Sequence, residues 1–297
     1  MKAIAASLLL FMAFLTNSCV TADSPQSTRI ALIQLPSSKV GDFSAMLAYA
    51  KAAKSQGAQM VVFPEESAFG WLNPNVFYEA KPIPGETVDA FSAIAKEAGI
   101  WVVAGLAERG RKIATNPDTY EVYDSGIVLD SNGALILHQR QHNVIKNAFS
   151  ACPATFGSEG CSYTPGRLDD ARVVETMLGR LAILVCADAY TYDPSALDAL
   201  KAHRPDIVIV PWGVTAGSKE ECGKEDFNAA GYAAKAAAHL KSAYVVGANG
   251  VGPRPYGRFL PSWYCGTSGF ATPDGQVGGV ANGEQELAIF DIPIRKK

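Results

Sequence analysis

The sequence predicts an α/β fold in which mixed sheets lie between layers of helices. Nine strand-like runs recur at wide intervals, and several are apolar on both faces, as in strands that are covered on both sides. Helical stretches separate many of these runs, and short turns join others directly. This order indicates β-α-β units with inserted hairpins, and no Pro/Gly/Ser-rich linker divides residues 29–297.

The expected strands are taken from apolar runs bounded by turn residues. They lie at residues 29–35, 59–65, 100–108, 125–130, 134–141, 172–178, 180–188, 206–212 and 243–249. Helices are expected at 42–57 and 85–99, which end at glycines, and at the Ala-rich stretch 226–243. Tight turns are expected at 130–133, 178–179 and 273–275.

Composition narrows the function classes. The chain has 297 residues, is 48% hydrophobic and 19% charged, and carries a net charge of −3. Such a chain buries a sizeable core. Because it has no long basic run, we expect neither nucleic acid nor an anionic membrane surface as its main partner.

The N-terminus has the features of a targeting segment. Lys2 precedes an apolar run that is too short to span a bilayer comfortably, and residues 20–22 (VTA) fit the small-residue cleavage rule. We expect a signal peptide at 1–22, a linker at 23–28 and a single domain at 29–297. The mature protein is then secreted or periplasmic and has no transmembrane span. Cys19 offers a lipid anchor as an alternative, although Thr16 stands where a lipoprotein box usually has Leu.

Export makes the cysteine count informative. Besides Cys19, the chain has five cysteines, and an odd number in an oxidising compartment leaves one thiol unpaired. Cys186 is the natural unpaired one because it lies on an apolar run. The preferred pairs are 152–161 and 222–265, although four cysteines allow three pairings and the sequence does not choose among them.

Reactive side chains follow the ends of predicted strands. Glu65 ends one run, and Cys186 stands where another run stops and a loop opens. Between them, the run 134–141 is followed by Lys146. A thiol nucleophile needs a base and an oxyanion stabiliser, and a desolvated Glu can be that base. Four histidines without an HxH or HExxH spacing give no metal site, and nothing indicates a cofactor.

Several ordered blocks resemble the nitrilase, or carbon–nitrogen hydrolase, superfamily. They are QMVVFPEESAFGW, YTPGRLDDARVVETMLGRLAILVCAD, PDIVIVPWGV, AAHLKSAYVVGANGVG and GTSGFATPDGQVGG. The resemblance implies an α-β-β-α sandwich that commonly forms homodimers, with Glu65 as general base and Cys186 as nucleophile. It also places a supporting glutamate shortly before the proline–glycine turn, which matches Glu159.

One position departs from the family pattern. Members usually carry an Arg-Lys pair at this point, whereas this chain has Arg140 followed by Gln141. We expect Lys146 to supply the missing ammonium, with Gln141 as a neutral donor or a weakened enzyme as alternatives. Five extended residues span up to ~17 Å, so the loop would have to fold back. The backbone N–H of Ala187 is expected to share the oxyanion.

The sequence therefore predicts a hydrolase that cleaves a small-molecule amide through a Cys186 thioester. Two alternatives remain: a nitrilase that acts on a nitrile, and a weakened or non-catalytic small-molecule-binding protein of the same fold.

Overall fold

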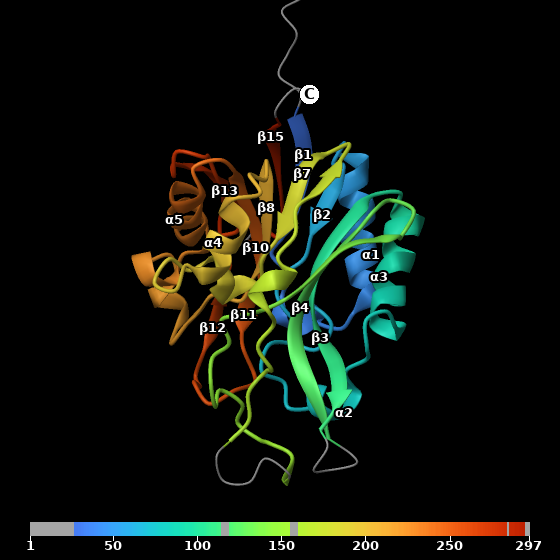
Figure 1. The fold of residues 1–297 in the computed structure, drawn as a ribbon, viewed down its shortest axis with the longest axis vertical. Coiled ribbons are helices and arrows are strands. Elements are labelled where there is room, and N and C mark those ends of the chain that lie inside the picture. Colours follow the sequence, from blue (N-terminus) through green and yellow to red (C-terminus); the bar gives the residue numbers. More distant parts are fainter. Residues whose placement is uncertain (1–26, 114–118, 155–159, 284, 295–297) are drawn as a thin grey trace, which may run out of the picture.

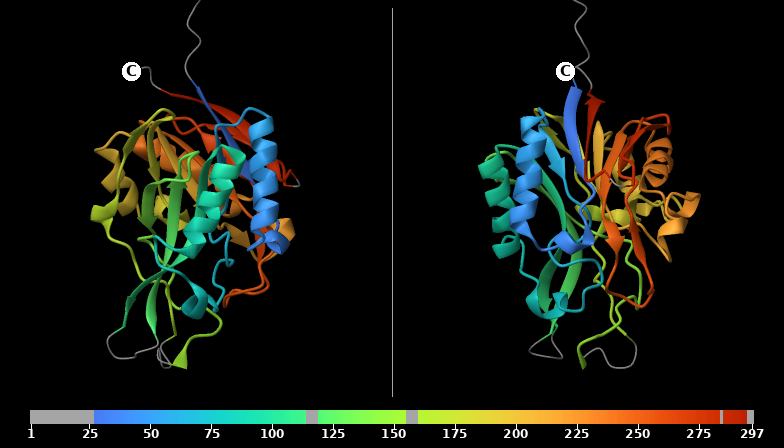
Figure 2. Two further views of the ribbon diagram at one scale, coloured as in Figure 1. Left: turned by 90° about the vertical axis from the view of Figure 1, so that its right-hand side faces the viewer. Right: turned by 180° about the vertical axis from the view of Figure 1, so that it is seen from behind.

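The computed structural model describes residues 27–113, 119–154, 160–283 and 285–294. Two six-stranded sheets pack face to face, and helices cover the outer face of each, as Figures 1 and 2 show. This arrangement is the predicted α-β-β-α sandwich. The predicted signal peptide at 1–22 lies outside the described residues. Within the described part of the chain, no helix is both long and apolar enough to cross a membrane.

The first sheet contains the N-terminal half of the chain and the last strand. Its order is β15-β1-β2-β3-β4-β5, with β1–β2–β3 parallel and the other pairs antiparallel. The strands are β1 (Ser27–Ile33), β2 (Met60–Val62), β3 (Trp101–Lys112), β4 (Tyr120–Leu129), β5 (Leu135–Arg140) and β15 (Leu287–Pro293).

The second sheet is built from the C-terminal half of the chain. Its order is β14-β13-β10-β8-β7-β6, with β7, β8 and β10 parallel. The strands are β6 (Val174–Thr176), β7 (Gly179–Ile183), β8 (Ile207–Trp212), β10 (Tyr244–Asn249), β13 (Gly269–Ala271) and β14 (Val277–Val280). A small third sheet contains β11 (Val251–Pro253), β12 (Trp263–Cys265) and β9 (Thr215–Ala216).

The helices cover the sheets as the apolar patterns require. The first sheet is covered by α1 (Phe43–Ser55) and α3 (Glu86–Ala98), and the second by α4 (Ser195–Lys201) and α5 (Ala229–Leu240). A short helix α2 (Val76–Glu79) lies beside β4. The Asp42 carboxylate accepts from the Ala45 N–H and caps α1, as the sequence predicts.

Strand alternation explains the layers. Along β1, Ala31 and Ile33 pack under α1 and α3, whereas Ile30 and Leu32 enter the core between the two sheets. Successive side chains of a strand point to opposite faces, so apolar residues at both positions need a cover on each side.

Element boundaries differ from the predictions where tertiary contacts extend or end a strand. Strand β1 begins at Ser27, inside the expected linker 23–28, because Ser27 pairs with Pro293 of β15. The run 180–188 is a strand only to Ile183, and Cys186–Ala189 form a 3-10 turn. The sequence did not reveal α4 or β15.

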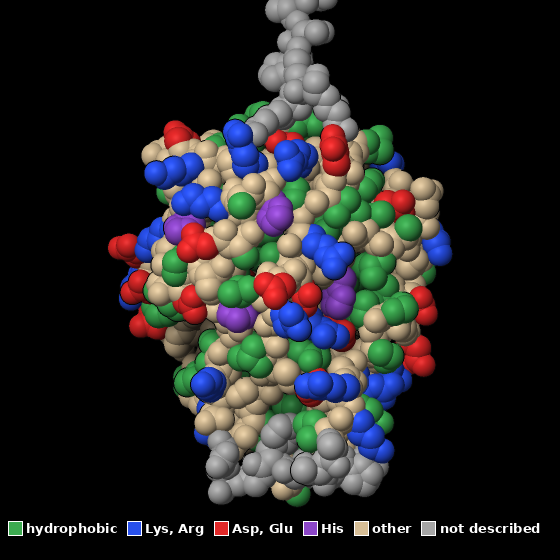
Figure 3. Space-filling model, in the orientation of Figure 1, with side chains coloured by type: hydrophobic (Ala, Val, Ile, Leu, Met, Phe, Trp, Pro, Cys, Tyr) green, Lys and Arg blue, Asp and Glu red, His purple; other side chains and the backbone are tan. Residues whose placement is uncertain are grey.

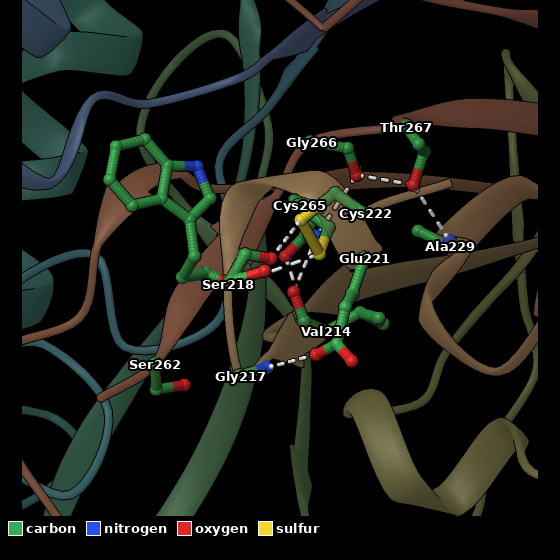
Figure 4. The surroundings of a disulfide bond; sticks show 12 residues. Val214, Gly217, Ser218, Glu221, Cys222, Ala229, Ser262, Cys265, Gly266 and Thr267 are labelled. Carbon is green, nitrogen blue, oxygen red and sulfur yellow. Dashed lines mark hydrogen bonds between the residues drawn. A yellow bond between two sulfur atoms is a disulfide. The ribbon is translucent and has the colours of Figure 1, made fainter. Parts of the chain in front are cut away.

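The cysteines pair as preferred from the sequence. Disulfides join Cys152 to Cys161 and Cys222 to Cys265, and Cys186 is the free cysteine of the described residues. Figure 4 shows the second disulfide tying the segment after β9 to β12, where the Cys265 N–H donates to the Val214 carbonyl oxygen at 3.1 Å.

Candidate active site

The candidate site lies where strands of the two sheets end next to each other. Glu65 follows β2, Cys186 follows β7 and Gly213 follows β8. The Glu65 N–H donates to the Trp212 carbonyl oxygen at 3.2 Å, which joins the ends of β2 and β8 across the sandwich. All three residues line one cavity of about 150 Å³, together with Gln141, Ala187 and Tyr190. Parallel strands deliver side chains to a common edge in this way.

Cys186 is held in an unusual backbone conformation. Its φ is +38°, in the left-handed region that a non-glycine residue rarely adopts. This turn at the strand exit places the thiol in the cavity, beside the Glu65 carboxyl and the Gly213 N–H, and 3.9 Å from the Tyr190 hydroxyl. Burial, followed by the negative charge of Glu65, raises the pKa of the Cys186 thiol well above its usual range. Cys186 therefore rests as a thiol, and a thiol in this state needs a base before it can attack as a nucleophile.

Glu65 is placed to be that base. Its side chain is buried, and burial raises its pKa to about 8, with the neighbouring Glu66 adding to the rise. Hydrogen bonds with Asp124, Cys186 and Gln141 oppose that rise because they stabilise the carboxylate. A base with a pKa near the working pH suits proton transfer in both directions.

Two glycines make room for Glu65. A Cβ atom on Gly213 would lie 1.8 Å from Glu65 Oε2, so only glycine leaves space for the carboxylate there. On β3, a Cβ atom on Gly105 would lie 2.6 Å from Glu65 Cα. A residue without a side chain is therefore needed at this position too, so that the backbone at Glu65 can pack against β3.

Gln141 contacts both sides of the site. Its Nε2 donates to Glu65 Oε1 at 3.3 Å and to the Val185 carbonyl oxygen at 3.2 Å. An amide nitrogen has two hydrogens, and both are used by these acceptors. The following loop is fixed by Asp188, whose Oδ1 accepts from the His142 and Asn143 N–H groups at 2.9 and 2.8 Å.

Residues 29–296 match the profile of the family described as Carbon-nitrogen hydrolase. The chain belongs to this family.

The curated relatives of this chain align with it over only part of its length and part of their own. It is 25% identical to a pantetheinase of Canis lupus familiaris over 54% of this chain and 33% of that protein. It is 26% identical to a nitrilase of Pyrococcus abyssi over 54% of this chain and 56% of that protein. A formamidase of Bacillus cereus is 34% identical over 29% of this chain and 25% of that protein. The matched part thus spans about a third of the pantetheinase and about half of the nitrilase.

Solved structures show the same fold. An amidase of Nesterenkonia sp. AN1 superposes with a TM-score of 0.67 over 90% of both chains, at 22% sequence identity. In that structure, the acetamide moiety of fluoroacetamide is covalently attached to the active-site cysteine.

The expected role of Lys146 stays a prediction, and its side chain is not among those that line the cavity. The structure brings Glu65, Gln141, Cys186 and Ala187 together, but Lys146 is exposed and does not line their cavity. Asp188 fixes the start of the loop after β5 by accepting from its first two N–H groups, and Ile145 of this loop lines the cavity whereas Lys146 does not. Gln141 therefore occupies the place beside Glu65. The expected supporting residue Glu159 lies outside the described residues.

Three further residues were not assigned to the site from the sequence. They are Gly213, Asp124 and Tyr190. The Tyr190 ring stacks on Tyr232 at 4.3 Å between centroids, which orients its hydroxyl toward Cys186. For Asp124, the available signal was an acidic residue directly before the expected strand 125–130. Among the described residues, no cluster of three or more His, Cys, Asp or Glu is arranged to hold a metal ion.

The surface around the layers carries mixed charge. Figure 3 shows basic and acidic side chains interspersed over one face, and the chain carries a net charge of only −3.

Proposed function

We propose that this protein hydrolyses the carbon–nitrogen bond of a small-molecule amide through a thioester on Cys186. The observation that carries the proposal is the placement of one buried thiol beside one buried carboxyl in a common cavity. The amidase and formamidase among the similar proteins are named for amides, which favours an amide over the nitrile alternative.

The first half-reaction forms the acyl-enzyme. Glu65 takes the thiol proton while Cys186 Sγ bonds to the amide carbon, and the carbonyl oxygen becomes an oxyanion. The intermediate then collapses: the carbon–nitrogen bond breaks, Glu65 returns the proton to the nitrogen, and ammonia or an amine leaves.

The oxyanion is assigned to a backbone donor. Ala187 follows the nucleophile directly and lines the cavity, and its N–H makes no backbone hydrogen bond to any described residue. Gln141 instead orients Glu65, because both of its Nε2 hydrogens already have acceptors.

The second half-reaction releases the acid. Glu65 takes a proton from a water molecule, and the resulting hydroxide attacks the thioester carbon. The carbon–sulfur bond breaks, and Glu65 returns the proton to the sulfur, which restores the starting enzyme.

The proposal also covers the location and the oligomeric state of the protein. We place the mature protein outside the cytoplasm, because two disulfides in a chain of this size suit an oxidising compartment. A homodimer follows from the family resemblance, and sedimentation of the purified protein tests it.

Mass spectrometry of the protein mixed with an amide panel tests the function. We expect an acyl adduct on Cys186, and turnover that disappears in Cys186→Ala. A nitrile that is turned over while every amide is refused contradicts the amide assignment. Tight binding of a small molecule without turnover of any amide or nitrile supports the non-catalytic alternative, which the neutral Gln141 motivates.

A further inference from the structure

Asp124 is a buried acid for which the described residues offer no N–H or O–H donor. It lies in β4 and is fully buried, and neither side-chain oxygen has such a donor within reach. Its side chain instead lies within hydrogen-bonding reach of the Glu65 carboxyl. A buried carboxylate without a donor or a cation is costly, so this contact needs an explanation.

The strand register points Asp124 into the site. Asp124 pairs with Ala107 of β3, and Gly126 pairs with Gly105, so all four positions share one face. A Cβ atom on Gly105 would meet Glu65, and one on Gly126 would meet Ile183 and Val185 of the opposite sheet. The face of β4 that carries Asp124 is therefore the one that looks between the sheets toward the nucleophile strand.

The surroundings offer little positive charge. Arg254 is the one cation among the ionisable groups that interact electrostatically with Glu65 or Asp124. These groups are Glu66, Tyr163, Cys186, Asp188, Tyr190, Arg254 and Tyr264. Where the family pattern has a lysine, this chain has the neutral Gln141. Two adjacent carboxyls in such a place cannot both ionise, so the pair retains a proton.

The hydrogen-bond donors decide which carboxyl holds that proton. Glu65 accepts a hydrogen bond from Gln141 Nε2 and lies beside the Cys186 thiol. Both of these donors stabilise the ionised form of Glu65. Asp124 has no such donor among the described residues. We propose that Asp124 stands as a neutral carboxylic acid that donates a hydrogen bond to the Glu65 carboxylate, and so acts as a positioning residue for the base. The inference rests on the proposed role of Glu65 and not on turnover of any substrate.

The test uses alkylation of Cys186 by iodoacetamide, followed at that peptide by mass spectrometry over a range of pH. The part of the profile that depends on Glu65 is defined as the part lost in Glu65→Gln. In Asp124→Ala the carboxylate loses its donor, so this part should move to higher pH by roughly one to two units. In Asp124→Asn the amide still donates, so the profile should stay close to wild type.

A matched control separates this role from a structural one. Glu108 is buried on the other face of the same strand pair, where it binds Ser125, His138 and Arg140. Glu108→Gln should lower the melting temperature without moving the alkylation profile. An Asp124→Ala profile identical to wild type, or an Asp124→Asn profile that shifts as far as Asp124→Ala, overturns the proposal.

A second measurement applies if Asp124→Ala does not fold. The infrared difference spectrum between wild type and Asp124→Asn, taken above the pKa of Glu65, should contain the carbonyl band of one protonated carboxylic acid. A carboxylate band in its place shows that Asp124 is ionised and rejects the proposal. Because neither readout needs turnover, a wild type that cleaves no amide defeats the proposed function without deciding the role of Asp124.

Discussion

Gln141 Nε2 lies 3.3 Å from Glu65 Oε1 and 3.2 Å from the Val185 carbonyl oxygen, so one neutral amide links the Glu65 carboxyl to the backbone directly before Cys186. The family resemblance led us to expect an ammonium at this point. The consequences of that difference can be measured.

Exchanging the neutral amide for a cation tests the electrostatics of the site. In Gln141→Lys, a positive charge beside Glu65 should lower the pKa of that carboxyl from about 8, so more of the base is ionised at neutral pH. We expect kcat/KM at pH 7 to rise and the acid limb of the pH profile to move down. A pH profile unchanged by the lysine would contradict the assignment of that limb to Glu65.

Removing the amide tests its positioning role. Gln141→Ala takes away one hydrogen bond to a charged group, which should lower kcat/KM about 10- to 100-fold. Lys146→Ala is the matched control, because Lys146 is exposed and outside the cavity. Its steady-state kinetics should equal those of wild type, and a large loss in Lys146→Ala would restore Lys146 to the site.

The pH dependence of wild type follows from Glu65. Its carboxyl is protonated below a pKa of about 8, and a protonated group cannot accept the thiol proton. We therefore expect kcat/KM to rise with pH through about 8 and level above it. Initial rates on the best amide in buffers of constant ionic strength measure this dependence. A fall in kcat/KM as the pH rises from 6 to 8 would contradict the role of Glu65 as the base.

Gly213 supplies a steric test. Gly213→Ala puts a methyl group where the Glu65 carboxylate lies, and a displacement of the base by about 1 Å can reduce kcat 100-fold. Gly283→Ala is the control, because no atom lies within 4 Å of a Cβ atom there. Both variants should keep their circular dichroism spectra. Full activity in Gly213→Ala would mean that Glu65 does not need this position.

The second disulfide connects stability to the site. Replacing Cys222 and Cys265 by serine opens a cross-link with a sequence separation of 43, which should cost roughly 2–4 kcal/mol in the free energy of unfolding. Val214 and Thr215, which line the cavity, pair with β12 at and beside Cys265, so KM should rise more than kcat falls. Urea unfolding and kinetics measure the two effects. The pair Cys152→Ser and Cys161→Ser, with a separation of 9, is the comparison, and we expect it to leave KM closer to wild type.

Much of the fold could be predicted from the sequence because it depends on local patterns. The two-sided apolar runs around β1, β8 and β10 required cover on both faces, and the sandwich provides it. Helices α1 and α3 end at Ser55 and Ala98, close to Gly57 and Gly99, the glycines that the sequence marks as stops. The sequence did not reveal β15, because the long-range pairing of Ser27 with Pro293 defines it.

The sequence by itself also determined which thiol is unpaired and which strand ends carry Glu65 and Cys186. The first follows from the odd number of cysteines besides Cys19, and the second from the positions at which apolar runs end. Only the tertiary structure shows that Gln141, and not Lys146, lines the cavity beside Glu65, since this depends on where a loop leaves β5. Asp188, 47 residues after Gln141 along the chain, settles that path by binding the loop N–H groups. The contact between Asp124 and Glu65 likewise exists only because the segment after β2 passes close to Gly105 of β3, the strand that pairs with β4.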